Sequence, residues 1–118
     1  MNSGLGALAI ILPLAILLMA VVSQLGGTGR LPRNGFLGLR IPSTLASDDA
    51  WRAGHRAAAL PAWCGFAAAA VVAVVCWTLI RSITAVDICV VVIGALFGVT
   101  VIWSLIAASR AARPHAPS

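Results

Sequence analysis

Long apolar runs occupy residues 5–25, 57–80 and 88–108, and each is interrupted by few or no charged side chains. A helix needs about 20 mainly apolar residues to cross the hydrocarbon core of a bilayer. We therefore predict an all-α integral membrane protein with three transmembrane helices. The predicted order is a first span at 1–25, a polar loop at 26–56, a second span at 57–80, a turn at 81–87, a third span at 88–109 and a disordered tail at 110–118.

The polar loop contains a second helical pattern. Ser47 precedes Asp48 and Asp49, which is typical of a helix start because a hydroxyl caps the first amides and acids favour the positive end of the helix dipole. At 100° per residue, one face then gathers the polar side chains, namely Asp48, Asp49, Arg52, His55 and Arg56. We predict a short amphipathic helix at about residues 47–58, with an Asp48–Arg52 pair and with Trp51 anchored among lipid headgroups.

The composition agrees with burial in lipid. Of the 118 residues, 61% are hydrophobic and 9% are charged, against about 25% charged residues in a soluble domain. The net charge is +5, but the arginines lie at the ends of apolar runs, which is a membrane-topology pattern and does not indicate nucleic-acid binding.

The arginines also predict the orientation. Three spans place the polar loop and the C-terminal tail on one side, and that side holds seven arginines, Arg30, Arg33, Arg40, Arg52, Arg56, Arg110 and Arg113, against Arg81 on the other. Arginine-rich loops stay in the cytoplasm, so we predict a bacterial inner-membrane protein with its N-terminus outside. The positions of Trp63, Trp77 and Trp103 near span ends agree with an interfacial belt.

Chemistry-bearing residues are few. Cys64, Cys76 and Cys89 are single and lie in apolar runs, so we interpret all three as buried hydrophobic residues and predict neither a disulfide nor a metal site. Thr84 and Asp87 have the spacing of a capping box, and Asp87 could also pair with Arg81. Because no nucleophile–base set or carboxylate pair is present, we predict a non-enzymatic protein without a cofactor.

The polar loop resembles a family signature. The pattern Asn34-x-x-x-Gly38-x-Arg40-x-Pro42-x-Thr44, followed by Ser47, Trp51 and His55, is similar to that of the SdpI family of bacterial multi-pass membrane proteins; Ile41 stands where the family often has threonine. The resemblance covers about 25 loop residues and the two following spans. It implies a protein of the immunity and signalling type, whose founding member protects its own cell from a secreted peptide toxin.

The resemblance makes Asn34, Gly38, Arg40, Thr44, Trp51 and His55 the motif residues. Together with Arg52 and Arg56 they are the candidate binding residues. Arg40 has the donors to bind a phosphate or carboxylate, and Asn34 could fix the loop through backbone hydrogen bonds. Anchoring of the loop against the bundle is an equal alternative for each motif residue. The expected partners are the bilayer with its anionic lipids, a membrane-active peptide or a partner protein.

Two other functions stay open on the sequence. The first is an accessory subunit of a membrane complex, because the Gly94-x-x-x-Gly98 pattern permits close helix approach, although packing within the same bundle is the simpler explanation. The second is a small oligomeric transporter. Against a transporter, residues 5–25 contain no ionisable side chain of the kind that small exporters need in their first span.

Overall fold

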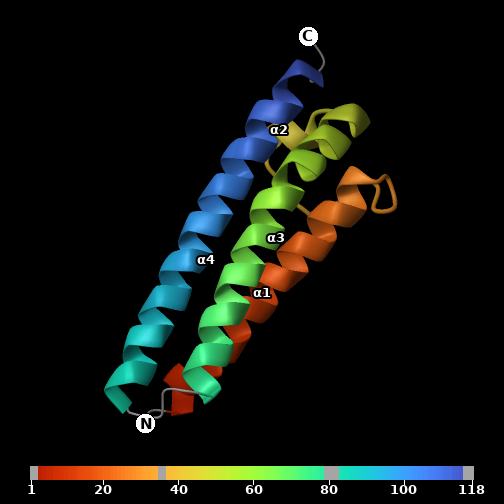
Figure 1. The fold of residues 1–118 in the computed structure, drawn as a ribbon. Helices are drawn as coiled ribbons and strands as arrows, with labels where there is room; N and C mark the ends of the chain where they lie inside the picture. The colour runs from red at the N-terminus through yellow and green to blue at the C-terminus, as the bar shows by residue number, and fades with distance from the viewer. Residues whose placement is uncertain (1–2, 35–36, 79–82, 116–118) are drawn as a thin grey trace.

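The computed structural model describes residues 3–34, 37–78 and 83–115 and consists of helices joined by short connections. The order is α1 (Ser3–Gly27), α2 (Pro42–Leu45), α3 (Asp48–Thr78), α4 (Ile83–Ala112) and the 3₁₀ turn η1 (Arg113–His115). The three long helices run side by side as an elongated bundle with extents of 55 × 21 × 19 Å, and α3 packs against both α1 and α4. The N-terminus lies at one end of the bundle, and the connection between α1 and α3 lies with the C-terminus at the other (Figure 1).

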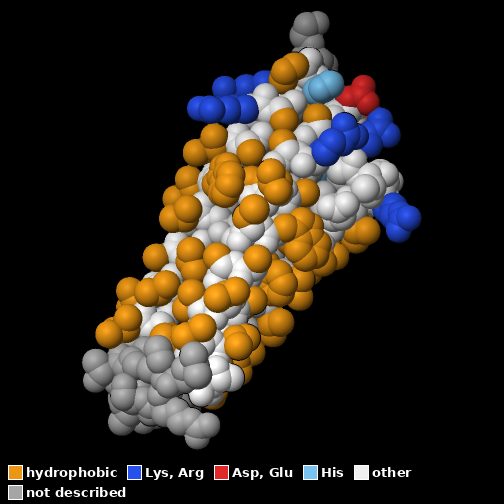
Figure 2. Space-filling model, viewed as in Figure 1, with side chains coloured by type: hydrophobic (Ala, Val, Ile, Leu, Met, Phe, Trp, Pro, Cys, Tyr) orange, Lys and Arg blue, Asp and Glu red, His pale blue; other side chains and the backbone are white. Residues whose placement is uncertain are grey.

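Three helices are long and apolar enough to cross a membrane, at residues 7–27, 48–78 and 87–115. Hydrophobic side chains cover the visible flank of the bundle, and the blue arginines gather at the end that holds the C-terminus (Figure 2). Large apolar residues such as Leu18, Val71 and Val91 are more than half exposed, as lipid-facing side chains are. This chain is a membrane protein in which the lipid-facing surface is apolar and the polar side chains collect at one end.

Small residues line the contacts between the long helices. Ala20, Ala58, Ala62, Ala69 and Ala108 are fully buried. At Gly65, an added Cβ would lie 2.0 Å from Oγ1 of Thr100, so α3 and α4 approach one another with no room for a side chain. Close approach of small residues is how helices associate where lipid removes the hydrophobic driving force.

The predicted amphipathic helix at residues 47–58 does not form as a separate element. Those residues are the first turns of α3, which continues through Pro61 to Thr78 over 31 residues. At 1.5 Å per residue this is about 46 Å, longer than the ~30 Å hydrocarbon core, so the α3 segment that carries the polar residues extends beyond the apolar band. Among its described residues, the loop contains only the four-residue α2.

The prediction for the C-terminal tail is wrong over most of its length. The tail is not disordered over residues 110–115, because α4 continues to Ala112, η1 follows, and the Ser47 hydroxyl donates a hydrogen bond of 2.7 Å to the His115 carbonyl. Residues 116–118 lie outside the described part of the chain. The predicted Thr84–Asp87 capping box stays a prediction: α4 is described from Ile83 onward, and the Thr84 side chain lies outside the described part of the chain. The proposed Arg81–Asp87 pair cannot be followed, since Arg81 is outside the described residues.

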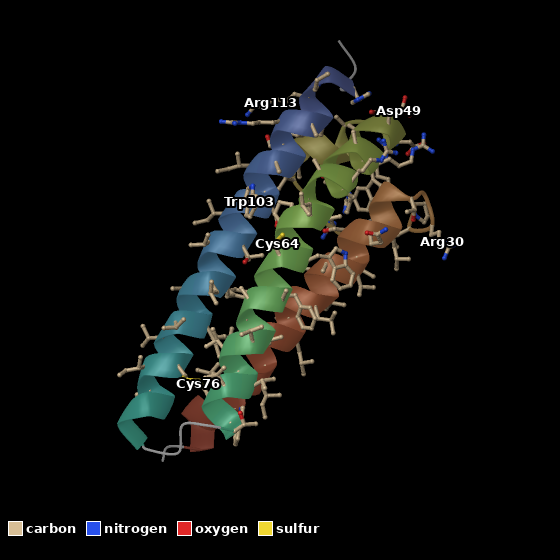
Figure 3. All side chains as sticks on the ribbon, in the orientation of Figure 1. Arg30, Asp49, Cys64, Cys76, Trp103 and Arg113 are labelled. Carbon is tan, nitrogen blue, oxygen red and sulfur yellow. A yellow bond between two sulfur atoms is a disulfide. The ribbon has the colours of Figure 1, made fainter. Side chains whose placement is uncertain are left out.

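The cysteine prediction is also wrong. Cys76 and Cys89 form a disulfide between α3 and α4, near the connection between these helices, with Cα atoms 6.5 Å apart. Thirteen positions separate them in sequence, and only the antiparallel arrangement of two helices brings them together. Cys64 is a free thiol with an exposed side chain and is not buried (Figure 3).

The glycines at 94 and 98 do not pack inside the bundle. A Cβ added at either position would have nothing within 4 Å. The close approach within the bundle occurs at Gly54 and Gly65 of α3, and the Gly94–Gly98 face of α4 is open.

Candidate functional site

The polar end of the bundle is built where the loop after α1 folds back over the first turns of α3. Trp51 and His55 lie one turn apart on α3, and both side chains are buried, with 1% and 0% of their surface exposed. The prediction from the sequence that Trp51 is an anchor among lipid headgroups is therefore wrong. The loop covers its ring and removes it from lipid and water.

Hydrogen bonds from these two side chains hold the loop in place. The Trp51 indole N–H donates to the Leu31 carbonyl at 2.9 Å, and the Leu39 N–H donates to Nε2 of His55 at 2.8 Å. Because Nε2 accepts, the hydrogen of a neutral ring is on Nδ1, which lies 2.7 Å from the Trp51 carbonyl and donates to it. The two rings also lie against one another, with centroids 4.2 Å apart and planes tilted by 38°. One turn of α3 thus fixes two points of the loop that are eight residues apart.

Gly38 lets the loop cross this pair of rings. Its φ of +120° is open to glycine and unfavourable for other residues. A Cβ there would lie 2.6 Å from the Trp51 ring and 2.9 Å from Nε2 of His55. A Cβ added at Gly26, on α1, would lie 2.5 Å from the His55 ring. His55 therefore lies between the end of α1 and the returning loop.

Thr44 and Asn34 stabilise the two bends of the loop. Thr44 is fully buried, accepts from the Ile41 N–H at 3.3 Å, and has its hydroxyl within reach of the carbonyls of Leu39 and Ile41. The Asn34 side-chain amide donates to the Pro32 carbonyl at 2.7 Å, and its oxygen accepts from the Leu37 N–H at 2.8 Å. Side-chain to backbone bonds of this kind fix turns.

Arg40 differs from the other motif residues. Its side chain is exposed and makes no hydrogen bond or ion pair with the residues that the structure describes. Asn34, Gly38, Thr44, Trp51 and His55 are all engaged in folding the loop. Within the motif, only Arg40 has side-chain N–H donors that no described residue engages. Arg40 is therefore the motif residue that can donate hydrogen bonds to a ligand or partner.

The helix-start residues pair differently from the prediction. The Ser47 hydroxyl caps α3 by accepting from the Ala50 N–H at 3.0 Å, but Arg52 pairs with Asp49 at 2.8 Å and not with Asp48. Asp48 instead forms an ion pair with Arg33, with 3.3 Å between its Oδ1 and Nε of the arginine. The Arg33 guanidinium also donates a hydrogen bond to the Leu45 carbonyl. Both ion pairs are exposed, and such pairs contribute about 0–1 kcal/mol.

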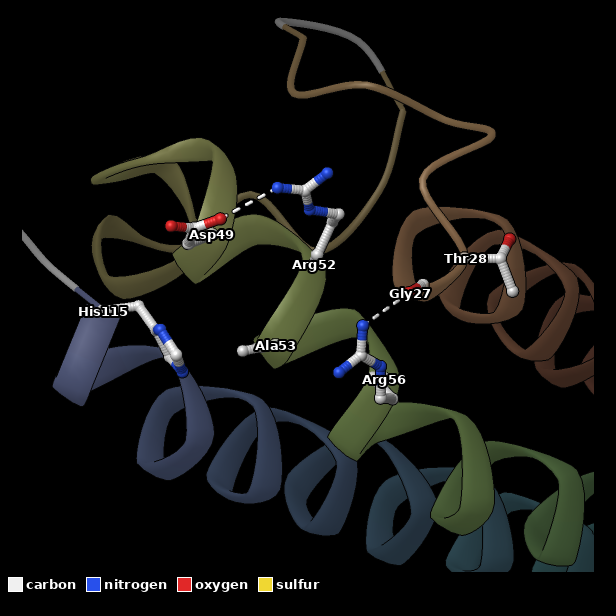
Figure 4. A pocket seen from close by; sticks show the side chains of 7 residues that line it. All are labelled: Gly27, Thr28, Asp49, Arg52, Ala53, Arg56 and His115. Atoms are coloured by element: carbon white, nitrogen blue, oxygen red, sulfur yellow. Dashed lines mark hydrogen bonds and ion pairs between the residues drawn. The ribbon is translucent and has the colours of Figure 1, made fainter.

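Arg56 lies at the junction of α1 and α3. Its guanidinium donates to the Gly27 carbonyl at 3.3 Å, at the end of α1, where this carbonyl has no backbone donor among the described residues. Together with Arg52, Thr28 and His115 it lines an open pocket of about 800 Å³ (Figure 4). Within the described part of the chain, no three His, Cys, Asp or Glu side chains are placed to hold a metal ion.

Several residues of this end escaped the sequence reasoning. The close contacts at Gly26, Gly27 and Gly54 join elements that are distant in sequence, and a glycine gives no sign of what lies opposite it. Arg33 was counted only toward the membrane orientation, and His115 was assigned to a disordered tail. A hydroxyl bridge of 3.3 Å between Ser43 and Ser109 joins the loop to α4, and no local pattern indicates it.

Comparison with known proteins agrees with the motif. The sequence model of the SdpI/YfhL protein family matches residues 30–108, which include the loop, α2, α3 and most of α4. Neither the curated proteins nor the solved structures contain a match to the chain. The family match begins after α1 and covers about two thirds of the sequence, including every residue of the motif. This membrane protein therefore belongs to the SdpI/YfhL protein family.

Proposed function

We propose that this chain is a non-enzymatic protein of the bacterial inner membrane that acts in immunity against membrane-active peptides or in signalling. In this proposal the polar end lies in the cytoplasm, the N-terminus lies outside, and Arg40 docks an anionic group of a partner protein. The observation that carries the docking role is the division within the motif. Its other members are used to fold the loop, whereas Arg40 is exposed and has no partner among the described residues.

The orientation rests on two independent features. Seven arginines are on the loop and the C-terminal segment, and arginine-rich ends stay in the cytoplasm. The Cys76–Cys89 disulfide joins α3 and α4 near the opposite end of the bundle, and disulfides persist in oxidising compartments such as the bacterial periplasm. Both features favour the same orientation.

The test is survival of a sensitive bacterial host that expresses the protein and is challenged with membrane-active peptides. Arg40→Ala should reduce protection, because a hydrogen bond to a charged group contributes about 1.5–3 kcal/mol, which corresponds to about ten- to hundredfold in affinity. Arg110→Ala is the matched control, since Arg110 is also exposed, at the same end and of the same charge. Both variants must be compared at equal abundance in the membrane. Equal protection by wild type and Arg40→Ala would refute the docking role.

A second function is favoured by the open face of α4. A Cβ at Gly94 or Gly98 would meet nothing within the molecule, so this face could accept a helix of a larger complex. Gly94→Leu should not disturb the bundle itself. If this substitution abolished function while Arg40→Ala preserved it, the accessory-subunit hypothesis would replace the docking proposal.

A further inference from the structure

Two pockets adjoin one another along the groove between α1 and α3. The first, of about 800 Å³, contains Arg52 and His115 (Figure 4); the second, of about 440 Å³, contains Leu60 and Trp63. They share three lining residues, which are Gly27, Thr28 and Arg56. The groove therefore passes from a polar region to an apolar one at Arg56.

One face of α3 supplies this change in polarity. Arg52, Arg56, Leu60 and Trp63 lie at spacings of four, four and three residues, which places them within an arc of about 80° on the helix. The stripe is about 16 Å long at 1.5 Å per residue. Its order, two arginines and then two apolar side chains, follows the order of headgroup and acyl chain in a bilayer leaflet.

The charge of the polar pocket suits a single negative group. Its charged lining residues are Arg52, Arg56 and Asp49, which leaves one positive charge when His115 is neutral. Arg52 uses one nitrogen on Asp49, and Arg56 uses one on the Gly27 carbonyl. Each guanidinium therefore keeps donors for a phosphate, which it can bind with two parallel hydrogen bonds.

A buried polar group lies next to the apolar pocket. Ser23 of α1 lines this pocket and is 0% exposed, and its hydroxyl has no hydrogen-bond partner among the described residues. An unpaired buried hydroxyl costs about 1–3 kcal/mol. Because its hydroxyl is fully buried, Ser23 belongs to the floor of the groove and is not itself a contact for a ligand.

We propose that α1 and α3 form a binding site for one anionic phospholipid. The phosphate lies between Arg52 and Arg56, and an acyl chain follows Leu60 and Trp63 toward the middle of the bilayer. This site goes beyond the proposed function and does not involve Arg40. Loss of lipid binding and loss of protection can therefore be observed independently.

The experiment measures binding of phosphatidylglycerol to the full chain in detergent by native mass spectrometry, with phosphatidylcholine as the comparison because it is zwitterionic and has no net charge. Arg52→Gln with Arg56→Gln should weaken phosphatidylglycerol binding about tenfold or more, because phosphate contacts from both arginines are lost. The matched control is Arg30→Gln with Arg110→Gln. It lowers the net charge of +5 by the same two units, and neither arginine lines either of the two pockets of the groove. This control should change binding by less than about twofold, since exposed charges are screened.

Two more variants test the polar pocket and the apolar pocket separately. Arg52→Gln alone leaves the Arg56–Gly27 contact intact, so it should weaken binding without affecting the end of α1. Ala59→Phe fills the apolar pocket without changing any charge and should also weaken binding. Equal losses in the two double variants would show attraction by total charge and would overturn the site.

A soluble competitor distinguishes lipid from a free phosphate. Glycerol 3-phosphate should not displace phosphatidylglycerol, because it lacks the acyl chain. Displacement at similar concentrations, or full binding by Ala59→Phe, would show that the polar pocket binds a phosphate without a lipid chain, and the proposal would be wrong.

Discussion

At the scale of single residues, the family motif is mainly a device for folding one loop. His55 joins three segments, since it accepts from the loop at Leu39, donates to its own helix at Trp51 and lies against Gly26 of α1. A histidine that is buried with both ring nitrogens engaged by backbone groups has a structural role. Arg40 lies outside this network, and for that reason it carries the docking proposal.

Gly38→Ala tests the folding role of the motif. The substitution requires a positive φ for alanine and a Cβ within 3 Å of Trp51 and His55, so we expect destabilisation of about 1–3 kcal/mol or more. The measurement is the thermal unfolding midpoint in detergent. Gly98→Ala is the control, because a Cβ there meets nothing, and its midpoint should stay close to that of the wild type. Equal midpoints for the two variants would contradict the close packing of the loop.

At the scale of elements, α3 organises the molecule. It packs on α1 and α4, its first turns carry the buried Trp51–His55 pair, and its last turn is linked to α4 by Cys76. The two ends of one helix are therefore held by different means. The polar end is held by hydrogen bonds to the loop, and the opposite end by a covalent bond.

Cys76→Ser with Cys89→Ser tests the covalent link. The disulfide closes a short loop, and the chain-entropy relation gives about 3 kcal/mol for a loop of about 15 residues. We expect a lower unfolding midpoint for this variant and, in the wild type, the same decrease on reduction. Cys64→Ser should have no effect, because Cys64 is a free exposed thiol. Maleimide labelling of both cysteines in the oxidised wild type would rule out the disulfide.

At the scale of the whole molecule, the polar side chains lie at one end of an apolar bundle. The loop and the C-terminal turn meet there through the Ser47–His115 and Ser43–Ser109 contacts, so the arginines of both segments form one positively charged end. A bundle with this distribution has a single favourable orientation in a membrane with a potential and an anionic inner leaflet.

Cysteine labelling tests that orientation. A cysteine introduced as Arg30→Cys or as Arg110→Cys, in a background with Cys64→Ser, should react with a membrane-impermeant maleimide in inverted vesicles and not in intact spheroplasts. Both positions are exposed, so lack of reaction reports the barrier of the membrane and not burial. Labelling of intact spheroplasts at either position would reverse the proposed topology.

Much of the fold was predictable because lipid imposes a simple rule. Backbone groups in hydrocarbon must be paired internally, so apolar runs of about 20 residues become helices regardless of their partners. The family motif was also readable, since its residues are fixed in type and spacing. The sequence did not indicate which motif residues fold the loop and which one is exposed, because spacing gives no information about burial.

The sequence by itself determined the three apolar helices, the side on which the arginines collect and the family, since these depend on composition and local order. Only the tertiary structure decided that α3 is continuous past Pro61, that Trp51 and His55 lie under a loop, that Cys76 meets Cys89 and that the Gly94–Gly98 face is open. Each of these depends on which surfaces meet across the bundle. Contacts between residues distant in the chain leave no periodic pattern in the sequence, and they follow from packing alone.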